Sequence, residues 1–324
     1  MMETLFGSSN WKMTIRREVD HVVVLRATTC DSCAVLPDTL FGLPVTVLGE
    51  KALAPTAKPV QGEEVRILCG KEGEWDNRNM QELTLPEPLS VVQNFAFYGC
   101  SSLHTLRLSD RIRRWGSGCV TNCRSLRKFH LTRVGKIQSE TLAVLCGELS
   151  DELDVTIQET DGTVTRLLFP EYAELYEENI PHHQFDYRIQ GGGYSYHYTF
   201  PGKQLSLRTY DDLWENYRRT QIEPEAAIRL AWYRLRWPVE LSESAEAQYA
   251  DYLRRHVEKT ILWQLTQKDP TGLKLLLDRL EPSADALHGA CELARQNGYT
   301  EALALLLERQ RSSVPRGFDR DFDL

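Results

Sequence analysis

The stretch from Ala96 to Leu108 reads AFYGCSSLHTLRL, and parts of it recur every 23 residues along the chain. A fixed period of this length is typical of a solenoid, in which each coil is too small to bury its own apolar side and is completed by its neighbours. The positions that keep one register are Met80, Leu103, Leu126 and Leu149; Leu83, Leu106 and Phe129; Leu85, Leu108 and Leu131; and Cys100, Cys123 and Cys146. We therefore expect stacked coils with parallel strands, and a role in binding.

These residues resemble the repeat of the BspA-like leucine-rich-repeat proteins of bacteria, whose unit reads roughly AF-x-x-C-x-x-L-x-x-L-x-L. The stretch from Leu36 to Leu53, LPDTLFGLPVTVLGEKAL, resembles the opening unit of that family. The likeness decays between Gly118 and Leu142, where other residues replace the Ala-Phe pair. The resemblance implies a bacterial protein that binds other macromolecules and carries no common catalytic residue set.

The composition is that of an ordinary soluble protein of 324 residues, with a net charge of -8. Residues 1–13 contain polar side chains where a secretory signal needs an apolar core, and no stretch approaches the roughly 20 apolar residues of a membrane span. We therefore expect a cytoplasmic protein without a membrane partner. No cofactor and no small-molecule substrate is evident.

The eight cysteines are interpreted as reduced. Cys100, Cys123 and Cys146 fall at the repeat position that is buried between coils, where a free thiol packs as a small apolar group. Cys30 and Cys33 form a single C-x-x-C without a second pair at zinc-finger spacing. We therefore predict no metal site, although whether Cys30 and Cys33 bind a metal stays open.

The pattern predicts an α+β protein in four parts. A short leucine-rich-repeat solenoid with parallel strands spans residues 1–165, and an irregular turn at 54–79 breaks its period. Residues 166–210 hold an acidic segment and a β-hairpin, in which Phe185–Gln190 pairs with Tyr194–Phe200 across Gly191 to Gly193.

A period of 3.6 residues then predicts a C-terminal α-helical domain at 211–311, followed by a flexible tail at 312–324. One long helix is expected over Ser242–Gln267, which contains no Gly or Pro. Residues 290–310 weakly resemble the helical hairpin of an ankyrin repeat, and an ordinary αα-hairpin is the favoured interpretation.

Charge is segregated along the chain. Between His104 and Gln138 there are nine basic residues and one acid, whereas between Ser139 and Asp186 there are twelve acids and one base. Such segregation can attract a partner, or another part of the same molecule.

Side chains alternate along a strand, so if the leucines of each repeat point inward their neighbours point outward. The outward positions are Glu82, Thr84, Thr105, Arg107, Lys128 and His130. The partner-binding residues that we predict from this pattern and from the basic stretch are Thr84, Thr105, Arg107, Arg111, Arg113, Arg114, Lys128 and His130.

No local catalytic signature is present in the sequence: it contains no H-E-x-x-H, G-x-S-x-G, Walker loop or dinucleotide fingerprint. We therefore predict a non-catalytic protein-interaction scaffold that binds an acidic protein surface. The first alternative is nucleic-acid binding through the basic stretch 104–138, which the acidic pI and the lack of any common nucleic-acid module disfavour. The second is self-assembly, or neutralisation within one chain, through the basic and acidic segments. The partner's identity, the pathway, the oligomeric state and the motion between the halves stay open.

Overall fold

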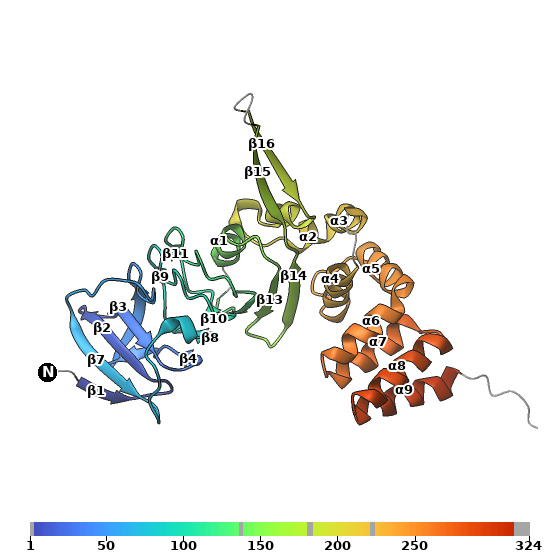
Figure 1. The fold of residues 1–324 in the computed structure, drawn as a ribbon, viewed down its shortest axis with the longest axis horizontal. Helices are drawn as coiled ribbons and strands as arrows, with labels where there is room; N and C mark the ends of the chain where they lie inside the picture. Colours follow the sequence, from blue (N-terminus) through green and yellow to red (C-terminus); the bar gives the residue numbers. More distant parts are fainter. Residues whose placement is uncertain (1–2, 136–138, 180–183, 221–223, 314–324) are drawn as a thin grey trace, which may run out of the picture. The chain divides into compact units, whose positions relative to one another are not determined.

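The computed structural model describes residues 3–135, 139–179, 184–220 and 224–313 (Figure 1). The chain divides into two compact units, residues 1–221 and 222–324. Unit 1 holds the strands, and the described part of unit 2 is helical. The α+β class expected from the sequence is therefore confirmed.

Unit 1 begins with a sheet that closes one end of the coiled region. Its strands are β1 (Glu3–Phe6), β2 (Trp11–Arg17), β3 (Val22–Thr29) and β7 (Glu63–Leu68). β2 is antiparallel to both β3 and β7, whereas β3 is parallel to β6 (Leu43–Leu48) of the first coil. Pairing with β6 continues the sheet into the coils, so the end strands act as a cap that covers the apolar edge of the first coil.

The coils stack as the 23-residue period requires. One strand from each coil joins a sheet in the order β14-β13-β12-β10-β8-β4. All neighbours in it are parallel except β14, which turns back along β13 and ends the stack. The bounds are β4 (Cys33–Val35), β8 (Glu82–Thr84), β10 (Thr105–Ser109), β12 (Lys128–Thr132), β13 (Leu153–Gln158) and β14 (Val164–Phe169).

A second run of short parallel strands lies further along each coil. It comprises β6, β9 (Val91–Val92) and β11 (Arg114–Trp115), and β5 (Thr39–Leu40) pairs with β6. Between these two strand runs the core is filled by the periodic apolar residues, which are buried in every coil. The coils are thus held together by parallel backbone ladders outside and by stacked apolar side chains inside.

The thiols of successive coils lie at equivalent positions. The Cys100 thiol donates to the carbonyl of Leu53 at 3.4 Å, and the Cys123 thiol donates to the carbonyl of Phe97 at 3.1 Å, each on the preceding coil. Both side chains are buried. Cys146 is buried too, but it lies in a helix, α1 (Thr141–Glu148), that replaces the extended turn of the next coil.

The irregular segment 54–79 is an insertion within the first coil. Cys33 in β4 pairs with Glu82 in β8, 49 positions later. That spacing exceeds one period by 26 residues, which is the length of 54–79. The inserted residues form β7 and the short helix η1 (Asn77–Asn79), and they return the chain to the next coil. The opening unit expected at 36–53 is therefore a true coil.

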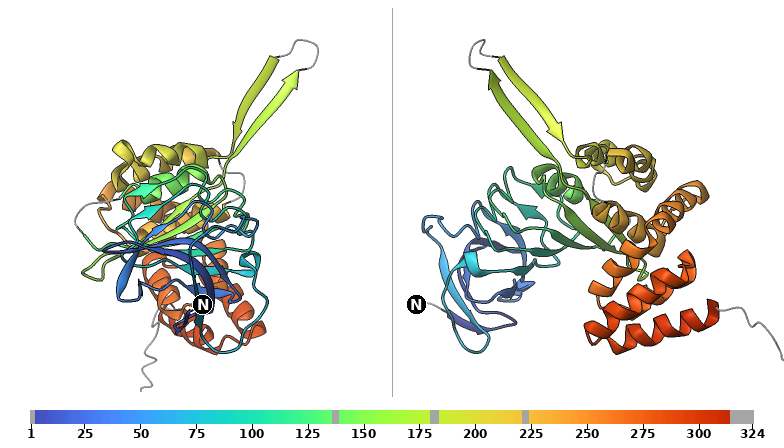
Figure 2. Two further views of the ribbon diagram at one scale, coloured as in Figure 1. Left: turned by 90° about the vertical axis from the view of Figure 1, so that its left-hand side faces the viewer. Right: turned by 45° about the vertical axis from the view of Figure 1, so that its right-hand side comes forward.

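The predicted glycine-turn hairpin is wrong in its pairing. Strand β16 (Gln184–Gln190) pairs with β15 (Ala173–Asn179), which precedes it, and Gly193–Thr199 forms the helix η2. A Cβ atom on Gly193 would lie 1.9 Å from the carbonyl oxygen of Pro170. The glycines therefore allow the chain to pass close to Pro170 at the base of the hairpin, rather than forming its turn. Figure 2 shows the two strands as a long ribbon.

Three further helices complete the described part of unit 1, and α2 among them contacts β14. They are η3 (Pro201–Lys203), α2 (Leu207–Asp212) and α3 (Trp214–Thr220). The Tyr210 hydroxyl donates to the carbonyl of Leu168 at 2.6 Å, and the ring of Phe169 stacks on Phe200. The first helices beyond 210 thus belong to unit 1, so the compact units divide at 221/222.

Unit 2 consists of helices joined by short connections. Their bounds are α4 (Glu225–Arg236), α5 (Glu243–Arg255), α6 (Val257–Thr266), α7 (Pro270–Leu280), α8 (Ala284–Gln296) and α9 (Thr300–Ser313). Ser242, Asp269 and Ser283 cap α5, α7 and α8 by accepting hydrogen bonds from backbone N–H groups. Most of the predicted tail lies outside the described residues.

The single long helix expected over residues 242–267 is wrong, because the chain breaks into α5 and α6 at His256. This residue leaves helical geometry at φ -118° and ψ 29°, and its Nδ1 lies 3.0 Å from the carbonyl oxygen of Tyr252. The His256 ring packs against the Tyr252 ring, with centroids 4.3 Å apart. These local contacts account for the break. It could not be predicted from the sequence, because the segment contains no Gly or Pro.

Candidate functional site

The strand register places the predicted outward residues in two rows. Thr84, Arg107 and His130 pair across β8, β10 and β12 to form one row. Glu82, Thr105 and Lys128 form the other. We call these six residues the strand face. Neighbouring strands lie about 4.8 Å apart, so each row is a ladder of closely spaced side chains fixed by backbone hydrogen bonds.

The opposite side of the same strands is apolar and buried, as the repeat predicts. The inward residues are Leu83, Leu106, Leu108, Phe129 and Leu131, and each is at most 4% exposed. Because alternate positions are held in the core, the strand face has a fixed orientation. A one-residue slip would move every leucine into solvent.

Accessibility differs within the strand face. Arg107 and Lys128 are exposed, and Glu82, Thr84 and His130 are half-buried. Thr105 is only 3% exposed, so its predicted contact with a partner is wrong. It lies between Glu82 and Lys128 on the neighbouring strands, and its hydroxyl is 3.1 Å from Nδ1 of His104. The accessible cations are therefore those of two adjacent coils.

The charge of the strand face is partly compensated by the chain itself. A nitrogen of the Arg107 guanidinium lies 3.6 Å from a Glu82 carboxylate oxygen. Lys128 has no ion pair among the residues that the structure describes. Burial lowers the pKa of His130 from its ordinary value, and the charge of Arg107 lowers it further. At neutral pH, then, the face offers two cations beside an imidazole that burial and Arg107 hold in its neutral form.

Three of the predicted residues lie elsewhere. Arg111 follows β10, and its guanidinium lies 3.2 Å from the Glu87 carboxylate. Arg114 begins β11, which belongs to the other strand run, and Arg113 directly precedes it; both are exposed. The structure therefore does not bring them to the strand face. Their shared place in a basic stretch of sequence gave no information on which side of the coil they occupy.

Basic and acidic segments neutralise each other in part within unit 1. Arg127 lies 2.9 Å from Asp151, and Arg133 lies 3.3 Å from Glu159, each one coil onward. Arg113, Arg114 and Arg124 are exposed without an ion pair in the described part of the chain. Lys136 lies outside the described residues. These two intrachain pairs therefore account for a small part of the segregated charge.

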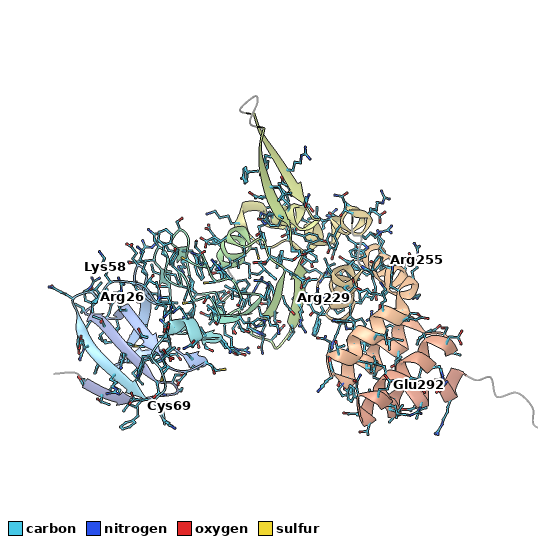
Figure 3. All side chains as sticks on the ribbon, viewed as in Figure 1. Arg26, Lys58, Cys69, Arg229, Arg255 and Glu292 are labelled. Atoms are coloured by element: carbon cyan, nitrogen blue, oxygen red, sulfur yellow. The ribbon has the colours of Figure 1, made fainter. Side chains whose placement is uncertain are left out.

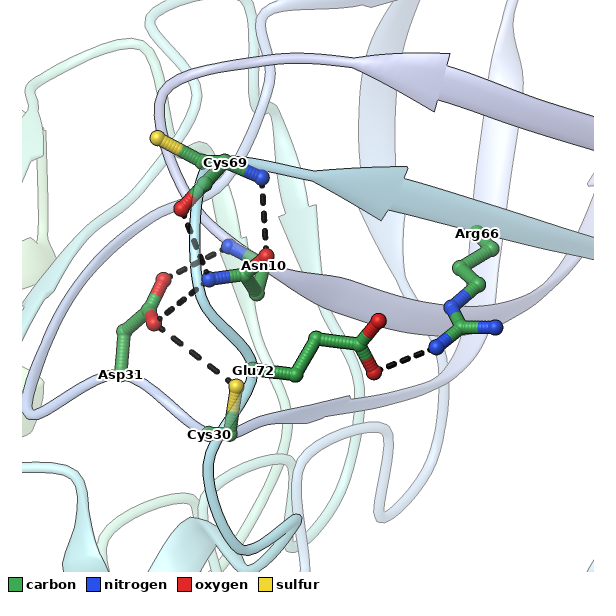
Figure 4. A network of polar contacts seen from close by, with 6 residues as sticks. All are labelled: Asn10, Cys30, Asp31, Arg66, Cys69 and Glu72. Atoms are coloured by element: carbon green, nitrogen blue, oxygen red, sulfur yellow. Dashed lines mark hydrogen bonds and ion pairs between the residues drawn. The ribbon is translucent and has the colours of Figure 1, made fainter.

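Cys30 of the C-x-x-C pair lies beside a network that joins three loops (Figure 4). The Asn10 amide donates to Asp31 at 2.9 Å and to the Cys69 carbonyl at 3.0 Å, and it accepts from the Cys69 N–H at 2.8 Å. The Cys30 thiol approaches Asp31 at 3.8 Å. In the described residues no three His, Cys, Asp or Glu side chains gather closely enough to hold a metal ion. The hydrogen bonds of the network hold the chain together where β2 begins and where β3 and β7 end.

The β15–β16 hairpin carries an aromatic surface that was not predicted from the sequence. Tyr176 and Tyr187 pair across the strands with ring centroids 5.1 Å apart, and they are 70% and 48% exposed. The alternation of residues in Ala173–Asn179 could have predicted a strand, but the acidity of the segment made it resemble a loop.

None of the helices in the described ranges has the length and apolar character that a membrane span requires.

Comparison with known proteins identifies the coiled region. Residues 71–166 match the family described as BspA type leucine rich repeat region, in six copies. A leucine-rich-repeat protein from T. pallidum has 19% identity and a TM-score of 0.29, over 37% of this chain and 50% of that chain.

A leucine-rich cell surface protein from Faecalibacterium prausnitzii has 14% identity and a TM-score of 0.26, over 40% of this chain and 32% of that chain. This chain therefore covers half or less of either relative. No curated protein matches the chain. The weak likeness of residues 290–310 to an ankyrin repeat stays a prediction.

Proposed function

We propose, from the match of residues 71–166 to the BspA type leucine rich repeat region, that the protein is a non-catalytic interaction scaffold whose strand face binds an acidic protein surface. The observation that carries the proposal is the register of β8, β10 and β12, which aligns Thr84, Arg107 and His130 in one outward row. Their buried neighbours hold this row in place.

A rigid face supports binding because little conformational entropy is lost when a partner docks. The backbone ladders fix the strands, and a Glu82 carboxylate oxygen lies 3.6 Å from the Arg107 guanidinium. Arginine is among the residues that most often dominate binding energy at interfaces. Lys128 adds a cation without an ion pair among the described residues, so an acidic partner would compensate charge that the chain leaves exposed.

The test is a charge reversal on the strand face. Arg107→Glu, Lys128→Glu and His130→Glu are combined in one variant, and the tagged protein captures partners from cells of the source organism. A matched control combines Arg113→Glu, Arg114→Glu and Thr121→Glu, which change the net charge equally at exposed positions outside the face. We expect the face variant to lose one or more captured proteins that the control retains, with unchanged circular dichroism. Equal capture by both variants would reject the strand face.

Nucleic-acid binding is a second candidate because Arg113, Arg114 and Arg124 are exposed and have no ion pair in the described part of unit 1. Such binding would weaken steeply as salt rises, by counterion release. A gel shift at low salt with single- and double-stranded DNA and RNA tests it. A complex that the Arg113→Glu, Arg114→Glu variant abolishes would favour this candidate over the scaffold, and the absence of a complex would remove it.

Self-assembly through the basic and acidic segments is the third candidate function. The pairs Arg127–Asp151 and Arg133–Glu159 show that part of this charge is satisfied within one chain. Sedimentation at low and high salt distinguishes the two situations, because screening weakens contacts between exposed charges on separate molecules. We expect a mass that does not change with salt. A mass that falls as salt rises would support assembly between chains.

A further inference from the structure

A cavity of about 620 Å³ opens where the insertion leaves the first coil. Its lining includes Arg26 of β3, Glu50 and Lys51 of the first coil, Lys58 of the insertion, and Phe95 and Tyr98 of the second coil. Figure 3 labels Arg26 and Lys58, which lie close together in unit 1. None of these residues belongs to the strand face. The volume is within the range of sites that hold small organic ligands.

The cavity carries an excess of positive charge around a fixed guanidinium. Arg26 donates to the carbonyls of Leu25 and Glu50 at 2.6 Å, and to that of Lys58 at 2.9 Å. Carbonyl oxygens orient the guanidinium without neutralising it, and no carboxylate forms an ion pair with it among the described residues. Burial lowers the pKa of Arg26 from its ordinary value. A bound anion would relieve that unfavourable desolvation.

The two lysines add charge that the single acid does not balance. The Lys51 ammonium lies 4.0 Å from the Glu50 carboxylate, which is the limit of an ion pair. It also lies 5.7 Å from the centroid of the Phe95 ring. Lys58 has no ion pair in the part of the chain that the structure describes. Three cations therefore face one carboxylate, which suits a ligand with more than one negative charge.

An aromatic wall lies on the other side of the cavity. The rings of Phe95 and Tyr98 meet edge to face, with centroids 6.0 Å apart and planes at 85°. Both side chains are half-buried. Phe95 and Lys51 have positive φ values of 57° and 55°. Gly118, one period after Phe95, has φ 65°, so this conformation belongs to the turn of the coil. The turn places Phe95 beside Lys51 in the lining of the cavity.

We propose that the cavity binds a small phosphate ester that carries an aromatic ring, of the size of a nucleoside diphosphate. The Arg26 guanidinium and the ammonium groups of Lys51 and Lys58 hold the phosphates, and the ring packs on Phe95 and Tyr98. Arginine and lysine are the usual phosphate-binding residues of proteins, and aromatic side chains accept any flat ring. This site is independent of the strand face, so either can fail without the other.

The test is calorimetric titration of the full chain with ADP, pyrophosphate and adenosine. ADP is expected to bind at least tenfold more tightly than either of its parts. The variant Lys51→Asn, Lys58→Gln is expected to weaken ADP binding by about tenfold or more. Asparagine is chosen because it tolerates the left-handed conformation, and Arg26 is left intact because it also bonds three carbonyls.

The matched control is Lys71→Gln, Lys274→Gln, which removes two exposed cations outside the lining. It is expected to change ADP affinity by less than twofold. The absence of ADP binding, binding of pyrophosphate as tight as that of ADP, or an equal effect of the control variant would each overturn the proposal. Unchanged circular dichroism of the Lys51→Asn, Lys58→Gln variant ensures that a loss of affinity reports on the site.

Discussion

The Asn77 side chain donates a hydrogen bond to the carbonyl of Leu53 at 2.7 Å, and this contact joins the two ends of the insertion. The same amide donates to the carbonyl of Ala27 at 2.8 Å and accepts from the N–H of Thr29 at 2.9 Å. Asn77 is 1% exposed. One side chain thus connects β3, the first coil and the returning insertion.

Asn77→Ala is expected to lower the free energy of unfolding by about 3 kcal/mol, because it removes three buried hydrogen bonds to the backbone, although the Leu53 carbonyl keeps the Cys100 thiol as a donor. Urea unfolding measures the loss. Asn79→Ala, an exposed neighbour in the same short helix, serves as the control and should change stability by less than about 0.5 kcal/mol. Equal effects of the two variants would show that the Asn77 network is not structural.

The buried thiols make the coils sensitive to alkaline pH. Burial raises the pKa of Cys123 from 9.0 to about 12. A group whose pKa is raised on folding contributes full stability below the pKa of the unfolded chain, so this contribution is lost as pH rises from about 9 to about 12. At three pKa units it is at most about 4 kcal/mol.

The comparison for this prediction is Cys123→Ser, whose hydroxyl does not titrate in that range. Its urea midpoint should fall less steeply than that of the wild type between pH 9 and pH 11. Cys33→Ser, at an exposed position, should follow the wild type. Parallel curves for all three proteins would contradict the burial of Cys123.

The stability that His130 contributes has the opposite pH dependence, because it is lost on the acidic side. The pKa of His130 is lowered from 6.5, first by burial and then by the charge of Arg107. The neutral imidazole is therefore favoured in the folded chain, and the stability it contributes is present above pH 6.5 and lost as pH falls through the lowered pKa. Arg107→Gln should raise the His130 pKa toward 6.5 in an NMR titration. An unchanged value would mean that the two side chains do not share one row.

Gly193 is expected to be intolerant of any side chain. A Cβ atom there would lie 1.9 Å from the Pro170 carbonyl oxygen, so Gly193→Ala must displace the backbone at the base of the β15–β16 hairpin. We expect a loss of about 2 kcal/mol or more in unfolding free energy. Gly147→Ala in α1 meets nothing within 4 Å, and should instead add up to about 1 kcal/mol. If Gly193→Ala left the unfolding free energy unchanged, Gly193 would not lie against the Pro170 carbonyl.

Features that repeat along the chain could be predicted from the sequence. The leucine positions gave the coils, the inward and outward alternation, and hence the row of Thr84, Arg107 and His130, because one physical requirement acts on every coil. The insertion was visible as a break in the period. The hydrogen bonds by which Asn77 joins the end of the insertion to β3 and the first coil could not be predicted, because a single asparagine has no periodic pattern.

Features that depend on contacts between distant residues could not be predicted. The hairpin partner of β16 was wrong because three glycines favour a turn locally, whereas the approach to Pro170 explains them in the structure. The burial of Thr105 depends on long neighbours from two other coils. The cavity at Arg26 combines three separate segments. The cytoplasmic location stays a prediction.

Site-specific photocrosslinking tests the strand face most directly. A benzophenone amino acid is placed at Thr84, beside Arg107 in the outward row, or at Thr121, an exposed position outside the face. We expect irradiation in cells of the source organism to link one discrete protein to the Thr84 derivative, and Arg107→Glu with Lys128→Glu in the same chain to abolish that adduct. Equal adducts from both positions, or an adduct from Thr121 alone, would contradict binding through the strand face.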